Sequence, residues 1–235
     1  METIARFCSQ HNIEFTPQIE IKLRHYTEYL MDYNQNVNLT AIKTPDEIEL
    51  KHFIDSITLL LATEVKGSVL DVGSGAGFPG VVLKLFRPEI ELSLMDSNGK
   101  KATFLELLCQ EMGIKGSIIL GRAEDFGNSP EHREQYDLVS ARAVAELNVL
   151  CEYCIPFVKP GGIFAAMKGA SWQEELNGAQ NAVKILGGRV KDTKEFVLPD
   201  GSRRGIVVIE KISHTPTKYP RIGAKISKKP LCNPE

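Results

Sequence analysis

The chain has 235 residues, of which 43% are hydrophobic and 25% are charged, and its formal net charge is −2. A chain of this length can bury one substantial hydrophobic core and still carry a small additional region. Its apolar runs are far too short to cross a bilayer, and its first residues lack the basic and apolar regions of a signal peptide. We therefore expect a cytoplasmic protein without a membrane segment.

The five cysteines are odd in number and scattered along the chain. Cys151 and Cys154 have the spacing of a metal or redox pair, but no second pair accompanies them. Buried free thiols are the better interpretation, and we predict no metal site.

The net charge hides an uneven distribution. Residues 213–235 contain five basic residues and one acidic residue, a net of +4, so the rest of the chain has 23 basic and 29 acidic residues, or −6. The same segment holds four of the twelve prolines, which predicts that it forms no regular helix. Two interpretations stay open: a disordered tail kept soluble by its charge, or a basic arm that contacts a nucleic-acid backbone.

Residues 1–65 are predicted to form a helical N-terminal region. Between residues 17 and 35 apolar side chains recur at steps of four and three, which is typical of one helical stripe. Thr44, Pro45 and Glu47 have the spacing of a capping box and predict a second helix that runs to about residue 61.

Residues 69–80 read VLDVGSGAGFPG and form the most informative stretch of the chain. Apolar residues around Asp71 predict a short buried strand. The glycines at 73, 75 and 77 then predict a turn that a ligand can approach closely, and Pro79 suits the start of a following helix. Such a turn lies at the carboxyl edge of an open α/β sheet, where nucleotides bind.

Two common nucleotide sites are excluded by spacing. No lysine closes the turn as a P-loop requires, and Phe78 occupies the position where a dinucleotide fingerprint needs its third glycine. The acid Asp71 ahead of a GxGxG turn would repel phosphate but suits an ammonium or sulfonium group. Asp96 ends a second predicted strand nineteen residues after Gly77, where a carboxylate can accept both ribose hydroxyls of an adenosine. This combination resembles the methyltransferases that use S-adenosylmethionine.

From residue 65 to residue 212, predicted strands and helices alternate, which favours a parallel sheet covered on both faces. The turn at residues 199–201 predicts that the last two strands form an antiparallel hairpin. We therefore expect an α/β fold, a Rossmann-like, seven-stranded, mostly parallel sheet of the class I methyltransferase type with an N-terminal helical extension. The predicted regions are 1–65 (helical), 66–212 (S-adenosylmethionine-binding domain) and 213–235 (basic, proline-containing tail).

Several further segments occur in a specific order. They are NLT at 38–40, HFIDS at 52–56, GFPG at 77–80, DS at 96–97, RAE at 122–124, SARAVA at 140–145, MKG at 167–169, TP at 215–216 and KYPR at 218–221. Together they resemble the small-subunit ribosomal RNA methyltransferase G family, also called glucose-inhibited division protein B. The match runs from about residue 16 into the basic tail.

The resemblance implies methylation of guanine N7 in bacterial 16S rRNA with S-adenosylmethionine as cofactor. It implies small-subunit rRNA or an assembling 30S subunit as partner, and we expect a monomer. Cofactor positions of such proteins correspond to Gly73, Phe78, Ala123, Glu124 and Arg142. With the residues argued above, the predicted cofactor-binding set is Asp71, Gly73, Gly75, Gly77, Phe78, Asp96, Ala123, Glu124 and Arg142.

The chemistry of guanine N7 is compatible with this sequence. N7 has an in-plane lone pair and no proton to lose, so methyl transfer needs alignment and no general base. The chain has neither the Asn/Asp-Pro-Pro-aromatic motif of amine methyltransferases nor the Pro-Cys nucleophile of cytosine-C5 enzymes. These absences support N7 chemistry only weakly, because sugar methylation could use a base elsewhere.

Arg142 and Lys168 are the predicted catalytic residues, since each ends a predicted strand at the reactive edge of the sheet. Arg142 can hold a phosphate or the cofactor carboxylate; alternatively it pairs with Asp137 or Glu146. Lys168 can donate a hydrogen bond to guanine O6 or to a phosphate; alternatively it is a surface lysine.

His52 and Asp55 lie three residues apart on one predicted helical face, either as functional groups or as a helix-surface pair that packs the N-terminal region on the sheet. No third residue has the spacing of a metal ligand.

Two other functions remain open. A non-catalytic ribosome-binding protein could retain the fold, although the acids and glycines of the turn are intact. A small-molecule methyltransferase would be expected to have an apolar lid and no basic tail.

Overall fold

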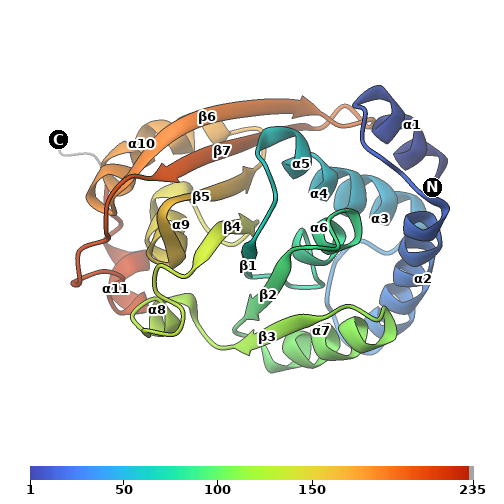
Figure 1. The fold of residues 1–235 in the computed structure, drawn as a ribbon, viewed down its shortest axis with the longest axis horizontal. Coiled ribbons are helices and arrows are strands. Elements are labelled where there is room, and N and C mark those ends of the chain that lie inside the picture. The colour runs from blue at the N-terminus through green and yellow to red at the C-terminus, as the bar shows by residue number, and fades with distance from the viewer. Residues whose placement is uncertain (233–235) are drawn as a thin grey trace.

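The computed structural model describes residues 1–232, and a seven-stranded sheet with helices on both faces forms its centre (Figure 1). The strands are β1 (Ser68–Val72), β2 (Glu91–Asp96), β3 (Gly116–Leu120), β4 (Tyr136–Arg142), β5 (Val158–Lys168), β6 (Gly188–Val197) and β7 (Arg203–Lys211). Their order across the sheet is β3-β2-β1-β4-β5-β7-β6. The predicted fold class is confirmed.

The pairing of the strands shows which edge of the sheet can bind a ligand. Strands β1 to β5 are parallel, whereas β7 runs antiparallel to both β5 and β6. Strand β1 pairs with β2 on one side and β4 on the other, so the strand order reverses next to β1. Ligands of open α/β sheets bind at this switch point, beyond the carboxyl ends of the strands.

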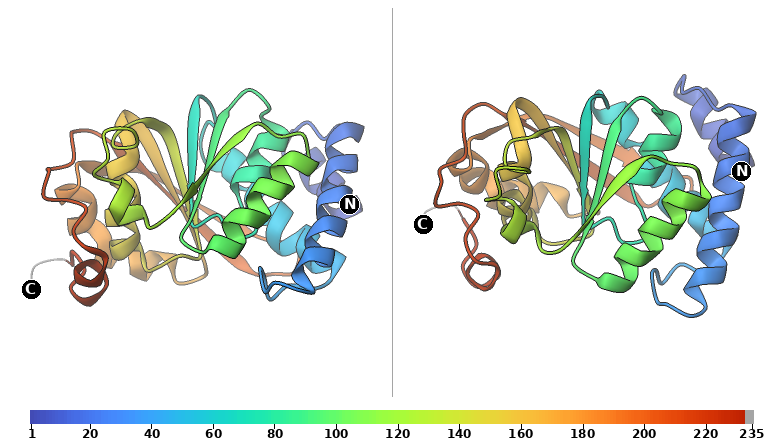
Figure 2. Two further views of the ribbon diagram at one scale, coloured as in Figure 1. Left: turned by 90° about the horizontal axis from the view of Figure 1, so that it is seen from below. Right: turned by 60° about the horizontal axis from the view of Figure 1, so that its bottom comes forward.

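Side chains that alternate along the strands feed two hydrophobic clusters, one on each face. Val69 of β1 joins the cluster beneath α6 (Gly80–Phe86) and α7 (Gly99–Glu111), while its neighbour Leu70 joins the opposite cluster. The second cluster lies under α9 (Leu147–Cys154) and α10 (Trp172–Ile185), with the short helix α8 (Ala123–Phe126) beside it. Figure 2 shows these layers from two further directions.

The N-terminal region consists of α1 (Glu2–Gln10), α2 (Pro17–Asn34), α3 (Pro45–Ile48), a π-helix at Glu49–Ile54, α4 (Asp55–Ile57) and α5 (Leu59–Ala62). Thr44 caps α3 as predicted, since its hydroxyl accepts from the backbone N–H of Glu47. The helix predicted to run to about residue 61 is present, but it changes to a π-helix over Glu49–Ile54 and is interrupted at Thr58. Glu49 in this π-helix is buried between the amino group of Met1 and the backbone N–H of Ile4.

The C-terminal segment, residues 213–232, packs on the domain. It includes α11 (Gly223–Lys228), so the prediction that prolines forbid a helix was wrong: the helix fits between Pro220 and Pro230. The side chain of Arg221 forms an ion pair with the fully buried Glu152 and is no free cation. Pro234 and Glu235 lie outside the described residues.

Cys8, Cys109, Cys151 and Cys154 are buried free thiols, and Cys232 is an exposed one. Burial raises the thiol pKa of Cys8 and of Cys109 to about 11. Within residues 1–232, no group of three or more side chains is arranged to hold a metal ion, and no helix is long and apolar enough to span a membrane.

Candidate active site

The glycine turn after β1 adopts the conformation for which its glycines are needed. Gly73, Gly75 and Gly77 have φ values of 72°, 59° and 96°, a region that other residues rarely adopt. The backbone N–H groups of Gly73 and Ser74 donate to the carbonyl of Met95 at 2.8 and 3.0 Å. The turn is therefore fixed to the end of the neighbouring strand β2.

Asp71 lies beneath this turn and is fully buried. Its Oδ2 accepts from the N–H of Gly80 at 3.0 Å and its Oδ1 accepts from the hydroxyl of Ser140 at 3.0 Å. Burial raises the pKa of Asp71 to about 6, although both hydrogen bonds oppose the rise. Asp71 thus joins β1, β4 and the start of α6, and it lines neither of the cavities described below. Its predicted direct contact with the cofactor stays a prediction.

A cavity of about 140 Å³, which we call the turn cavity, opens at the ends of β1, β2 and β3. Four predicted cofactor residues line it: Gly73, Asp96, Ala123 and Glu124. Asp96 is positioned from both sides, because its Oδ2 accepts from the N–H of Gly75 and its Oδ1 from the N–H of Asn98, each at 2.9 Å. Gly75 does not line the cavity, but its N–H orients the Asp96 carboxylate, which does. Gly77 does not line the cavity either.

Of the other residues that line the turn cavity, Tyr153 and Val144 come from the segment from β4 to α9 and were not predicted to contact the cofactor. Tyr153 comes from α9, and no motif marks it. Val144 belongs to the SARAVA segment, which could have indicated it. A Cβ atom added to Gly73 would lie 2.5 Å from Val144 Cγ2, so the backbone of the turn is in close contact with this side chain.

Phe78 lies behind the turn, in a stack of aromatic rings. The rings of Tyr26 and His52 pack on it at centroid distances of 5.1 and 4.3 Å, and the Arg142 guanidinium lies 5.3 Å from its centroid. The Tyr26 hydroxyl also donates to the carbonyl of Ala76. Phe78 therefore connects the turn to the N-terminal helices and does not line the turn cavity.

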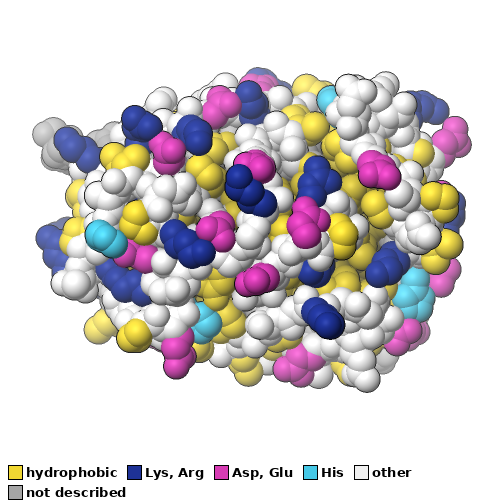
Figure 3. Space-filling view, in the orientation of Figure 1, with side chains coloured by type: hydrophobic (Ala, Val, Ile, Leu, Met, Phe, Trp, Pro, Cys, Tyr) yellow, Lys and Arg dark blue, Asp and Glu magenta, His cyan; other side chains and the backbone are white. Residues whose placement is uncertain are grey.

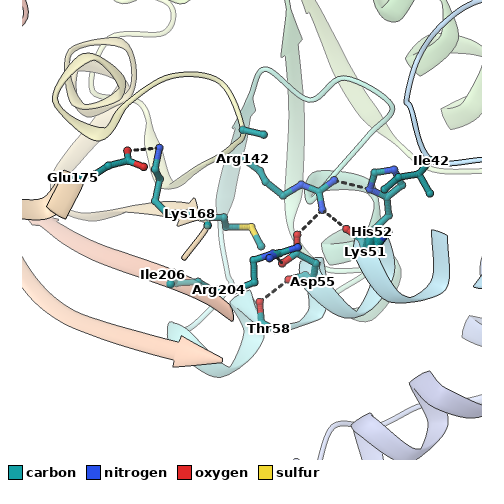
Figure 4. A pocket seen from close by; sticks show the side chains of 14 residues that line it. Ile42, Lys51, His52, Asp55, Thr58, Arg142, Lys168, Glu175, Arg204 and Ile206 are labelled. Carbon is teal, nitrogen blue, oxygen red and sulfur yellow. Dashed lines mark hydrogen bonds and ion pairs between the residues drawn. The ribbon is translucent and has the colours of Figure 1, made fainter. Parts of the chain in front are cut away.

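A second cavity, of about 370 Å³, lies between the N-terminal region and the ends of β4, β5 and β7 (Figure 4). We call it the arginine cavity. Both predicted catalytic residues, Arg142 and Lys168, line it, as do His52 and Asp55. Its charged lining residues are four cations, Lys51, Arg142, Lys168 and Arg204, and two carboxylates, Asp55 and Glu175.

Arg142 joins the sheet to the π-helix and α4. Its Nη1 donates to Asp55 Oδ2 at 2.8 Å and to the carbonyl of Lys51 at 3.0 Å, and its Nη2 lies 3.0 Å from His52 Nδ1. The alternatives of a pair with Asp137 or Glu146 were wrong, because the N-terminal region supplies the carboxylate.

His52 is a neutral imidazole in this network. Burial, followed by the adjacent Arg142 charge, lowers its pKa to about 3. Because an arginine only donates, His52 Nδ1 is the acceptor, and Nε2 carries the proton toward the Thr40 hydroxyl at 3.0 Å. Both ring nitrogens of His52 are therefore engaged.

Asp55 lies between two guanidinium groups. Besides the bond from Arg142, its Oδ1 lies 3.2 Å from Arg204 Nε, an ion pair without the alignment of a hydrogen bond. Both Asp55 and His52 are buried and contact Arg142 at the end of β4, which agrees with the alternative of a helix-surface pair that packs the N-terminal region on the sheet.

Lys168 is also buried, with a side chain 8% exposed, so the surface-lysine alternative was wrong. Its ammonium donates to the carbonyl of Ala145 at 2.7 Å and pairs with Glu175 at 2.6 Å. Glu175 in turn accepts from the N–H of Leu147. Lys168 thus fixes the loop between β4 and α9.

That loop separates the two cavities. Arg142 and Ala143 line the arginine cavity, and the next residue, Val144, lines the turn cavity. Ala143 has a φ of 56°, a conformation that costs a residue with a side chain roughly 1 kcal/mol or more. Strained residues of this kind cluster at active sites and ligand-binding sites.

Comparison with known proteins shows which family this chain resembles. The family model for rRNA small subunit methyltransferase G matches residues 19–205. A relative in Alkaliphilus metalliredigens, named ribosomal RNA small subunit methyltransferase G, is 47% identical, covering 89% of this chain and 90% of its own. A relative of the same name in Lactobacillus delbrueckii subsp. bulgaricus is 45% identical, covering 98% and 99%.

Solved structures resemble the fold at low sequence identity. M. jannaschii TYW2 in complex with AdoMet has a TM-score of 0.54 at 14% identity, covering 72% of this chain and 78% of its own. A SAM-dependent methyltransferase from Aquifex aeolicus has a TM-score of 0.51 at 17% identity, covering 71% and 93%. The order of motifs, the glycine turn and these matches agree, and the chain belongs to the rRNA small subunit methyltransferase G family.

Proposed function

We propose that this chain transfers the methyl group of S-adenosylmethionine to N7 of a guanine in 16S rRNA, with the cofactor in the turn cavity and the guanine in the arginine cavity. The cofactor supplies an electrophilic methyl group on a sulfonium centre. The residues of the chain bind it, orient the acceptor beside it and hold the two partners in line.

The lining of the turn cavity fits an adenosine. The Asp96 carboxylate is fixed by two backbone N–H groups and keeps lone pairs that can accept from ribose hydroxyls. Ala123 offers a backbone N–H and Glu124 a carboxylate for the edge of the base. Gly73 keeps the wall beside Val144 free of a side chain.

The observation that carries the N7 assignment is the state of the acid–base groups around the arginine cavity. His52 is neutral with both nitrogens engaged, Asp55 is held between two arginines, and Glu175 is paired with Lys168. None of the lining residues is thus placed as a free general base. Methylation of guanine N7 requires none, whereas a sugar hydroxyl or an exocyclic amine must lose a proton.

The charge of the arginine cavity suits a nucleotide. Its four cations outnumber its two carboxylates, which favours the phosphate that accompanies a guanine in RNA. Guanine O6 beside N7 accepts hydrogen bonds, and Arg142 and Lys168 supply donors on the wall nearest the turn cavity.

The test is transfer of a tritiated methyl group to naked 16S rRNA and to 30S subunits, followed by mapping of the modified base. We expect incorporation at a single guanine, and none when that guanine is replaced by 7-deazaguanine. Incorporation that survives the 7-deaza replacement would refute N7 as the acceptor. Cofactor binding without transfer to any ribosomal substrate would favour the non-catalytic ribosome-binding alternative.

We also propose that the protein acts as a monomer in the cytoplasm, where its ribosomal substrate is found. Sedimentation at micromolar concentration with and without 30S subunits tests the oligomeric state.

A further inference from the structure

The C-terminal segment contacts two elements that line the turn cavity. Helix α8 carries Glu124 and helix α9 carries Tyr153, and both residues line this cavity. Residues 213–228 pack against α8 and α9 through three separate sets of contacts. The C-terminal segment is therefore in a position to influence the shape of a cavity whose lining residues all lie between positions 72 and 153.

The first set holds the segment to the end of α8. The side-chain amide of Asn128 donates to the carbonyl of Pro220 at 3.2 Å. Arg133 Nη1 donates both to the carbonyl of Gly127 at 3.0 Å and to that of Tyr219 at 2.8 Å. A Cβ atom added to Gly127 would lie 2.9 Å from Pro220 Cγ, so the backbone at Gly127 is in close contact with the proline ring.

The second set holds the segment to α9. Both the backbone N–H and the Nε of Arg221 donate to Glu152 Oε1 at 2.8 Å, and its Nη2 donates to Oε2 at 2.6 Å. Glu152 is fully buried and immediately precedes Tyr153. Removing Arg221 from this pair would leave the buried Glu152 charge uncompensated, at a high cost in free energy. The segment is therefore fixed to α9.

The third contact reaches the cavity residue itself. Gly223 begins α11, and a Cβ atom added there would lie 1.8 Å from Oε1 of Glu124 and 2.8 Å from its Cδ. Gly223 has a helical backbone that any residue can adopt. Glycine is needed at this position because a larger residue would collide with Glu124. On another side, Arg122 Nη1 lies 3.7 Å from the same Oε1. The Glu124 carboxylate is thus confined, with a side chain only 7% exposed.

We propose that Gly223 is a positioning residue for the cofactor: its backbone confines the Glu124 carboxylate so that it accepts from the exocyclic amino group of adenine. The inference rests on the proposed function, which assigns the turn cavity to S-adenosylmethionine. A carboxylate held in one orientation before binding loses less conformational freedom on binding and selects a donor at a fixed place. A side chain at position 223 displaces that carboxylate.

The experiment compares Gly223→Ala with Gly178→Ala, a control in α10 where an added Cβ meets no atom within 4 Å. Calorimetry measures the Kd of S-adenosylhomocysteine and of S-inosylhomocysteine, which carries an oxygen in place of the amino group. We expect Gly223→Ala to raise the Kd of the adenosyl ligand at least about tenfold and to reduce the preference over the inosyl ligand. The control should change neither value, and both variants should melt within a few degrees of the unaltered protein.

A double variant tests the route through Glu124. If Gly223 acts by confining Glu124, then Gly223→Ala adds no further loss of affinity in a Glu124→Ala background. Losses that add in the double variant, an unchanged Kd in Gly223→Ala, or an unchanged preference between the two ligands would each overturn the inference. Calorimetry needs no RNA, so an unaltered protein that binds the adenosyl ligand but methylates no guanine contradicts only the proposed function.

Discussion

Arg142 is shared between two tasks, because the guanidinium that lines the arginine cavity also neutralises a carboxylate from another part of the chain. Its bonds to Asp55, His52 and the carbonyl of Lys51 use donors on both Nη atoms. The planar, forked guanidinium can reach all three partners at once, which a lysine ammonium cannot. Substitutions at this position therefore have to separate loss of function from loss of fold.

The first prediction concerns Arg142→Lys. The ammonium keeps a charge for the buried Asp55, so we expect a folded protein, but turnover should fall at least about tenfold, or about 1.4 kcal/mol of barrier. Arg142→Ala should also lose thermal stability, because Asp55 then keeps only Arg204. Steady-state methyl transfer and melting curves on both variants make the measurement. An Arg142→Lys protein whose activity loss equals its unfolded fraction would show that the role is structural.

The second prediction concerns Asp96. Replacing it with Ala removes hydrogen bonds to a charged group and should weaken cofactor binding by about 1.5–3 kcal/mol. The same change frees the N–H groups of Gly75 and Asn98, so Asp96→Asn is the matched variant that retains one acceptor oxygen. Calorimetry with S-adenosylhomocysteine measures the effect, and an unchanged Kd in Asp96→Ala would remove Asp96 from the cofactor site.

The third prediction follows from the pKa of Asp71. Burial raises it from 3.8 to about 6, so the folded protein binds this proton more tightly than the unfolded chain. The resulting stabilisation is complete below pH 4 and is lost as the pH rises through 6. Asp71→Asn does not titrate. Its unfolding free energy relative to the unaltered protein should therefore rise between pH 4 and 7, by up to about 3 kcal/mol.

Denaturant unfolding of both proteins at several pH values provides the measurement. Other carboxylates titrate in both proteins and cancel in the difference. A difference that stays flat with pH would mean that Asp71 has an ordinary pKa.

Among the elements, the packing of α10 on β7 bounds the arginine cavity from one side. Gly205 of β7 lines that cavity, and a Cβ atom added to it would lie 2.1 Å from Cγ of Trp172, at the start of α10. Trp172 is 8% exposed and is the only tryptophan of the chain. A change at Gly205 is therefore visible in the intrinsic fluorescence.

We expect Gly205→Ala to displace Trp172 and to lower the free energy of unfolding by about 1–3 kcal/mol, the usual range for overpacking a tight core. Its fluorescence spectrum should shift, whereas that of Gly178→Ala should not. An unshifted spectrum with unchanged stability would show that β7 and α10 adjust without cost.

The elements that the sequence predicted best are those with a local signal. The glycine turn, its flanking strand and helix, the strand that ends at Asp96 and the final hairpin each follow from side-chain period or turn residues within a few positions. The π-helical segment at Glu49–Ile54 was not predicted, because the apolar period of this stretch does not distinguish a π-helix from an α-helix. α11 was missed because the prolines of the segment predict no regular helix, whereas six residues fit between Pro220 and Pro230 and bury Ile226.

The same distinction applies to the site. Asp96, Gly73, Ala123 and Glu124 meet at one cavity because each follows a strand whose end could be located in the sequence. Asp55, the partner of Arg142, lies 87 residues away in the N-terminal region, and Glu175, the partner of Lys168, lies in the next element, α10, without a motif that connects the two. No spacing rule connects such pairs.

At the scale of the whole molecule, charge is interspersed and not collected into one basic field. Figure 3 shows basic and acidic side chains mixed over the face seen in Figure 1. The C-terminal segment remains a local exception, because Lys218, Lys225, Lys228 and Lys229 are exposed, whereas Arg221 is ion-paired. A docked segment presents these four charges from a fixed place.

The fifth prediction is that replacing these four lysines with Gln flattens the salt dependence of RNA binding, by about 0.7–0.9 in the log–log slope for each phosphate that is no longer neutralised. The methylated base should not change, since contacts to phosphate position the protein without reading sequence. The matched control replaces Lys22, Lys66, Lys184 and Lys191, which are exposed and distributed over other elements. Equal slopes for the two quadruple variants would mean that only net charge matters.

The five thiols differ in burial, so a sulfhydryl reagent should react with only one of them in the native protein. Alkylation proceeds through the thiolate, and burial both shields Cys8, Cys109, Cys151 and Cys154 and raises their pKa values. Cys232, four residues after α11, is exposed. A maleimide dye should therefore attach at this one position in the native protein, without any engineered cysteine. Its fluorescence anisotropy would then report the docking of the C-terminal segment while cofactor or RNA is added.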